Sequence, residues 1–136
     1  MHKKANVTSD LAKKIISMHI AGATYTEIII ETKQPINRIR HILGMNRTIR
    51  TDAQRNFYMA VLDACAQSDT YVQAEPIMKS LIQAGYLTDE KSVENLREMS
   101  NYQILKAKRL GKLSLPIVRL AIDLYFGSPN LKATFV

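Results

Sequence analysis

The sequence predicts an all-α fold, and three observations carry that prediction. Apolar residues recur every three or four positions along most of the chain, which is the period of an amphipathic helix. Proline and glycine number only four and five in 136 residues, and several of them stand where a helix would begin or end. No pair of alternating segments is joined by a hairpin turn. With 46% hydrophobic and 23% charged residues, the composition is that of a soluble globular chain.

Residues 10–43 predict three short helices in succession. Their expected limits are 10–22, 24–34 and 35–43. Gly22 and Gly44 are expected to end the first and third helices, and Pro35 fits the first turn of the third. Three isoleucines at 28–30 have the propensity of a strand, but the flanking threonines and the short connections favour a helix.

Five further helices are expected after a basic connector at 44–52. Their expected limits are 52–66, 71–84, 89–100, 102–110 and 114–126. Gly85 and Gly111 are expected to end the second and fourth of these helices. Pro116 fits the first turn of the last one. No run approaches the roughly 18 apolar residues of a membrane span, so we expect a cytoplasmic chain without membrane contact.

The charge divides the chain into three segments. The net charge is +7, but residues 1–50 carry nine Lys and Arg against three acids, whereas residues 51–100 carry four against eight. Residues 101–136 carry six against Asp123 alone. We expect the basic ends to contact a polyanion. The predicted division is a DNA-binding unit, an acidic helical segment for dimerisation or a partner, and a second basic unit.

The three N-terminal helices have the layout of a tri-helical helix-turn-helix, in which the third helix enters the major groove. Amide side chains pair with adenine, and arginine pairs with guanine or phosphate. The residues expected to contact DNA are Lys33, Gln34, Asn37, Arg38, Arg40, His41, Arg47 and Arg50. The sequence departs from the motif at Ile29, Lys33 and Gln34, which stand where alanine, glycine and an apolar residue are usual. A three-helix packing unit with a charged outer face remains an alternative.

Residues 102–126 predict a second unit that resembles a helix-turn-helix. Ala107 precedes Gly111 by four positions, which is the spacing between the short helix of the motif and its turn. The surrounding cations, expected to hold phosphates or to bring the unit into a second groove, are Lys106, Lys108, Arg109, Lys112 and Arg119. A basic helical hairpin that only packs against the rest of the chain is the alternative.

The middle segment is expected to form a dimer or partner interface. Its apolar residues exceed what one small core needs, and a helix-turn-helix protein of this size usually dimerises to reach two half-sites. The residues expected at that interface are Phe57, Tyr58, Tyr71, Ile77, Leu81 and Tyr86.

Short stretches at both ends of the chain resemble the flagellar master transcriptional activator family (FlhC/FlhD-like). The segment 10–43 resembles its larger subunit, through Gly22-Ala23, Glu31-Thr32-Lys33-Gln34 and Arg38-Ile39. The run 113–121 resembles a Leu-Thr-Leu-Pro segment of the smaller subunit, and 124–129 resembles a segment of the larger one. The resemblance implies a transcriptional activator that joins a second regulator subunit and recruits RNA polymerase, with relatives on plasmids and other mobile elements. The larger subunit has a cysteine-rich zinc site, which this chain, with Cys65 alone, does not match.

Enzyme motifs are lacking in the sequence. There is no glycine-rich phosphate loop, no nucleophile motif and no metal-ligand spacing among His2, His19, His41 and Cys65, so we expect no catalytic residue, metal or cofactor. We interpret the chain as a DNA-binding transcription regulator of a bacterium or mobile element, and more readily an activator than a repressor. Two alternatives remain: a module that binds RNA polymerase or a regulator subunit without reading DNA, and a non-specific nucleoid or partition-type DNA binder.

Overall fold

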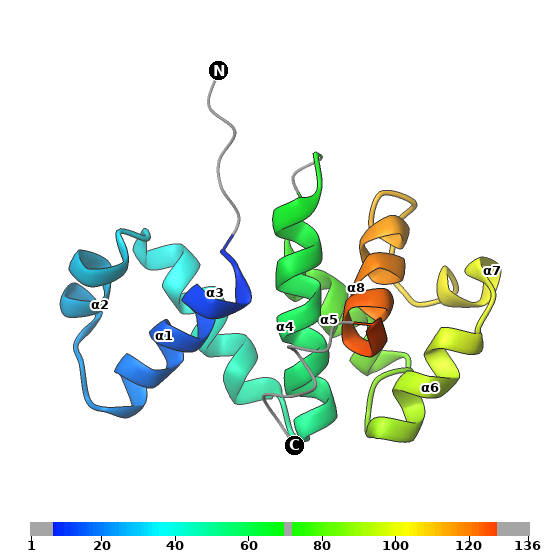
Figure 1. Cartoon of the computed structure of the whole chain (residues 1–136), viewed down its shortest axis with the longest axis horizontal. Helices are drawn as coiled ribbons and strands as arrows, with labels where there is room; N and C mark the ends of the chain where they lie inside the picture. Colours follow the sequence, from blue (N-terminus) through cyan, green and yellow to red (C-terminus); the bar gives the residue numbers. More distant parts are fainter. Residues whose placement is uncertain (1–6, 70–71, 128–136) are drawn as a thin grey trace.

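A computed structural model of the chain describes residues 7–69 and 72–127 (Figure 1). These residues form eight α-helices and no strand, which confirms the prediction of an all-α fold. The helices are α1 (Ser9–Ile20), α2 (Tyr25–Thr32), α3 (Ile36–Thr48), α4 (Asp52–Gln67), α5 (Ala74–Gln83), α6 (Glu90–Glu98), α7 (Asn101–Ile104) and α8 (Leu115–Gly127). Among them, none is both long enough and apolar enough to span a bilayer.

The first turn of α1 is fastened to α4. The helix begins at Ser9, one residue before the expected start, and Thr8 caps it, with its hydroxyl accepting from the Leu11 N–H at 3.4 Å. The Asp63 carboxylate on α4 accepts from both the N–H and the hydroxyl of Ser9, each at 2.8 Å. A carboxylate beside a helix N-terminus is favourable because unpaired N–H groups point toward it. Asp63 therefore fixes where α1 starts on the core.

The helix predicted over the three isoleucines is confirmed as α2. Gly22 follows α1 with φ 96°, a conformation that glycine adopts without a steric cost. Thr24 then caps α2, and its hydroxyl accepts from the Glu27 N–H at 3.1 Å. The Glu27 carboxylate accepts from the Thr24 N–H at 2.8 Å in return. This reciprocal capping box fixes the helix start despite the strand propensity of the isoleucines.

The third helix is longer than expected, because α3 runs through Gly44 to Thr48. Met45 and Ile49 are only 2% and 6% exposed, and they continue the buried row that begins at Ile39. Burying two large apolar side chains stabilises the fold by about 1.5–3 kcal/mol each. Glycine inside a helix costs only about 1 kcal/mol relative to alanine. The prediction that Gly44 ends the helix is therefore wrong.

Helix α4 forms the centre of the molecule. In Figure 1 it stands between α1–α3 on one side and α6–α8 on the other. Its most extensive packing is against α8, and it also packs against α1 and α5. Ten of its sixteen residues are buried. The predicted middle segment therefore packs against elements of both basic ends.

The apolar residues expected at a partner interface belong instead to this core. Phe57, Tyr58, Ile77 and Leu81 are at most 2% exposed. Phe57 and Tyr58 lie on α4, whereas Ile77 and Leu81 lie on α5. Their burial within one chain leaves none of these four side chains at the surface for a partner, which corrects that part of the prediction. Tyr86 is half-buried, with its hydroxyl donating to the Gln103 carbonyl at 3.1 Å. Tyr71 lies outside the described residues.

The helix predicted at 102–110 is reduced to the four residues of α7. Beyond Ile104 the chain forms tight turns, in which the Ala107 N–H donates to the Ile104 carbonyl and the Leu110 N–H to that of Ala107. These i→i+3 bonds bury Ile104, Ala107 and Leu110 in turn, at 0–6% exposed, and Arg109 between the last two is left-handed at φ 67°. The chain therefore bends here instead of continuing as a helix. The other helices lie close to their predicted limits.

Candidate nucleic-acid interface

A tight turn joins α2 to α3. Lys33 closes α2 in the left-handed conformation, at φ 59° and ψ 29°, and its N–H donates to the Ile29 carbonyl at 2.8 Å. Pro35 then caps α3 with extended backbone. The left-handed residue stands at the position where the helix-turn-helix motif usually has glycine, because glycine adopts positive φ without a Cβ clash. Lys33 thus keeps the backbone of a glycine turn and adds an exposed cation.

The outer face of α3 carries an exposed polar stripe. The exposed residues are Asn37, Arg40, His41, Arg47 and Thr48. Their spacing of three, four and seven places them along one side of the helix. The opposite side packs into the core through Ile39, Ile42 and Leu43, at 0–2% exposed. No residue of α3 is acidic, so the charges on this stripe are those of the cations Arg40 and Arg47.

Of the other predicted contact residues, Gln34 precedes α3, Arg38 lies in its first turn and Arg50 follows the helix. Gln34 and Arg38 are half-buried. Burial raises the pKa of Tyr58 and the Glu75 carboxylate adds to the rise, whereas the positive charge of Arg38 opposes it. Arg38 therefore lies close enough to the buried Tyr58 of α4 for its charge to act on that hydroxyl. Arg50 is exposed beyond the end of α3.

A shallow hollow of about 190 Å³ lies between α3 and α5. It is lined by Arg40, His41, Gly44, Met45, Thr48, Glu75 and Lys79. The Glu75 carboxylate is only 7% exposed and accepts from the Tyr58 hydroxyl at 2.7 Å, which anchors α5 to α4. Lys79 is exposed and adds a cation beside the α3 stripe. Sequence reasoning missed it, because it belongs to the acidic segment and only the fold brings it here.

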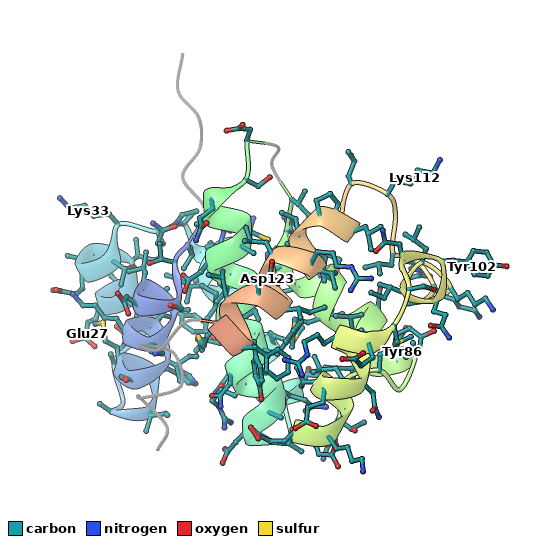
Figure 2. All side chains as sticks on the ribbon, turned by 45° about the vertical axis from the view of Figure 1, so that its right-hand side comes forward. Glu27, Lys33, Tyr86, Tyr102, Lys112 and Asp123 are labelled. Atoms are coloured by element: carbon teal, nitrogen blue, oxygen red, sulfur yellow. The ribbon has the colours of Figure 1, made fainter. Side chains whose placement is uncertain are left out.

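The second group of predicted contact residues lies at the other end of the molecule. Lys106, Lys108, Arg109 and Lys112 are exposed on the connection between α7 and α8. In Figure 2, Lys33 and Lys112 project from opposite ends. The two cationic groups therefore do not form one continuous surface.

Arg119, the remaining predicted contact, makes internal hydrogen bonds. Its Nε donates to Asn101 Oδ1 at 2.8 Å and its Nη2 donates to the Met99 carbonyl at 2.7 Å. These bonds tie α8 to the start of α7. Helix α8 buries one side against α4 and exposes Asp123 on the other. It therefore lacks the acid-free polar stripe that α3 carries.

Metal and thiol chemistry find little support in the residues that the structure describes. Across residues 7–69 and 72–127, no three His, Cys, Asp or Glu side chains are grouped so that they could hold a metal ion. Cys65 is buried in α4, and burial raises its pKa to about 12, with a further contribution from the charge of Glu75. A thiol with a raised pKa is a poor nucleophile at neutral pH.

Comparisons of the chain with protein-family models, with curated proteins and with solved structures each found no match. No matched protein therefore contributes to the functional proposal.

Proposed function

We propose that the chain is a DNA-binding transcription regulator that reads double-stranded DNA by inserting α3 into the major groove. The observation that carries the proposal is the acid-free outer face of α3, where Asn37, Arg40 and His41 are exposed at neighbouring positions. The major groove is wide enough for a helix, and these side-chain types pair with base edges there. Three short helices with a tight turn before the last one are the scaffold that such a reading helix requires.

Six exposed residues of this region each receive a role that suits their chemistry. Asn37 donates to and accepts from the edge of an adenine, and Arg40 donates to a guanine. Lys33, Arg47 and Arg50 hold backbone phosphates around the reading helix. Lys79 supplies a further phosphate contact from α5, beside Arg40 and His41.

The finer assignment, to an activator that works with a second subunit, draws on the resemblance of both ends of the chain to the flagellar activator family. In that assignment the protein acts in the cytoplasm as a dimer or hetero-oligomer and recruits RNA polymerase. Two copies of α3 would read two half-sites about one helical turn of DNA apart.

The test is selection of bound fragments from a pool of genomic duplexes at near-physiological salt, followed by sequencing. A shared motif is expected, and fluorescence anisotropy on that motif then measures variants. Asn37→Ala and Arg40→Ala should each weaken binding about tenfold and relax the preference at one base pair. Lys91→Ala, which removes an exposed cation from α6, is the matched control. Wild-type affinity and preference in both α3 variants would exclude α3 as the reading helix.

A second candidate, a DNA binder without sequence choice, is favoured by the presence of cationic groups at two opposite ends of the molecule. Such a protein would show the same steep loss of affinity with salt but no shared motif. A module that only binds other proteins would show little affinity for DNA at any salt.

A further inference from the structure

A large aromatic side chain stands exposed at the α7 end of the molecule. Tyr102 is 74% exposed, although its backbone is held firmly. A capping box between Ser100 and Gln103 fixes α7, and the Tyr86 hydroxyl braces it from the end of α5. The Lys106 Nζ lies 4.9 Å from the centroid of the Tyr102 ring. An exposed aromatic ring with a cation at its face, on a backbone held by hydrogen bonds, is a surface suited to contact.

The cations that follow α7 extend this surface. Lys106, Lys108, Arg109 and Lys112 are all exposed, and no acidic residue occurs between positions 99 and 122. Leu113, at 71% exposed, adds an apolar side chain at the end of the strip. Figure 2 shows Tyr102 and Lys112 projecting from the same end of the molecule.

A hollow of about 460 Å³ opens beside the strip. It is lined by Gln83, Ala84, Tyr86, Lys106, Ala107 and Lys108. A hollow of this volume falls in the range of sites that take a small organic group. The strip therefore combines an aromatic platform, a row of cations and a recess in one place.

We propose that this surface binds single-stranded nucleic acid. One base stacks on the Tyr102 ring, the phosphates that follow it run along Lys106, Lys108 and Arg109, and a neighbouring base enters the hollow beside Tyr86. Aromatic stacking with a cationic track is how proteins hold single strands without sequence preference. The contact is independent of α3, which lies toward the other end of the molecule (Figure 1).

Two other occupants explain less of this surface. A duplex hides the faces of its bases in the stack, so it would meet the cations and leave Tyr102 and Leu113 without partners. An acidic protein segment would also meet the cations, but it does not carry the flat π-systems that match an isolated exposed ring. A single strand satisfies the ring, the cations and the recess together.

The test measures fluorescence anisotropy of labelled oligothymidine and oligouridine, each of about twelve nucleotides, with the full chain. Tyr102→Ala should weaken binding about tenfold, and Tyr102→Phe, which keeps the ring, should bind as the wild type does. Lys108→Ala should weaken binding and reduce the slope of log affinity against log salt by about 0.7. Oligodeoxyuridine, which differs from oligouridine only in the sugar, then shows which sugar the surface prefers.

The matched control is Tyr25→Ala, which removes an exposed tyrosine from α2 at the other end of the molecule. It should leave oligonucleotide binding unchanged, and circular dichroism should show that every variant is folded. Wild-type affinity in Tyr102→Ala, or no binding of either oligonucleotide by the wild type, would overturn the proposal. So would binding of polyglutamate that Tyr102→Ala abolishes, because it would assign the surface to an acidic protein. Asn37→Ala should leave oligonucleotide binding intact, so failure here is distinguishable from failure of the proposed function.

Discussion

The α1–α3 and α6–α8 regions share their local construction and differ in what they do with their last helix. An Ala-Gly pair with positive φ at the glycine ends α1 inside the first region and α5 just before the second, with Gly22 at 96° and Gly85 at 80°. Each also places a left-handed cationic residue before its last helix, Lys33 in one region and Arg109 in the other. Yet α3 keeps an exposed polar stripe, whereas α8 packs along α4. Turn chemistry sets where helices begin and end, and packing decides which of their faces remain available: α3 packs against α1, α2 and α5, and α8 packs against α4 and α6.

The largest expected difference between the two regions follows from placing the same negative charge near the middle of each last helix, at a buried site in α8 and at an exposed site in α3. Ala121 of α8 is fully buried, so Ala121→Asp should lower the free energy of unfolding by about 3–5 kcal/mol, since the new carboxylate has no partner. His41 of α3 is exposed, so His41→Asp should change stability by only about 0.5 kcal/mol. His41→Asp should instead weaken duplex binding, because it places an anion against phosphates. Urea unfolding measures the first effect and anisotropy the second. Equal stability of the two variants would contradict the burial of this side of α8 against α4.

The next largest effect concerns the anchor beneath the α3–α5 hollow. Tyr58→Phe removes the hydroxyl that donates to the Glu75 carboxylate and leaves that carboxylate buried without its partner. The free energy of unfolding should fall by about 1.5–3 kcal/mol. Tyr86→Phe is the matched control, because its hydroxyl bonds a carbonyl at an exposed site, and its loss should cost less. A smaller loss in Tyr58→Phe than in Tyr86→Phe would contradict the anchoring role of Glu75.

Alkaline pH should lower the free energy of unfolding through two buried groups of α4, Tyr58 and Cys65. Burial raises the pKa of the Cys65 thiol from 9.0 to about 12, and burial also raises that of Tyr58. A group whose pKa is raised in the folded chain contributes stability that is complete below its unfolded pKa and lost as pH rises beyond it. The free energy of unfolding should therefore fall above about pH 9, by up to about 1.4 kcal/mol per pH unit for the thiol.

Urea unfolding across this pH range measures the slope, and Cys65→Ala isolates the thiol. Between about pH 9 and 10 the variant should lose less stability than the wild type, because the phenols of the unfolded chain ionise only near pH 10. Identical slopes for the two proteins would show that the thiol does not ionise differently in the folded and unfolded states.

The sequence predicted most helix limits because those limits are set by short-range chemistry. Gly22 and Gly85 lie within two residues of the helices that they are expected to end, and α2, capped by Thr24, begins one residue after its expected limit. The errors arise where distant residues decide. Gly44 does not end α3, because Met45 and Ile49 find a core formed by other helices. The same core buries Phe57, Tyr58, Ile77 and Leu81, which are predicted from the sequence to lie at a partner interface.

The candidate surfaces were predicted in part, for the same reason. The exposed residues of α3 follow from helical periodicity, which is local. Lys79 joins them only through the packing of α5 beside α3. Tyr102 is expected from the sequence to begin a helix of nine residues, but α7 ends at Ile104. The exposure of Tyr102 follows from the bend after Ile104, which the local sequence pattern does not predict.

The smallest expected effect on the free energy of unfolding concerns the two left-handed residues, Lys33 and Arg109. Replacing Lys33 or Arg109 with glycine relieves a steric cost of about 1–2 kcal/mol at positive φ. The greater freedom of glycine in the unfolded chain offsets about 0.4–1 kcal/mol of that, so each variant should gain about 0.5–1 kcal/mol in the free energy of unfolding. Lys33→Ala keeps the Cβ and removes the charge, so it should gain nothing.

Binding then distinguishes the two sites that stability treats alike. Lys33→Gly removes a phosphate contact and should reduce the salt slope of duplex binding by about 0.9 while leaving oligothymidine binding unchanged. Arg109→Gly should do the reverse, because its cation belongs to the strip that follows α7. If both variants weakened binding of the same ligand, the two cationic ends would bind one nucleic acid together. The α3 surface and the α7 surface would then be separate in the structure but not in function.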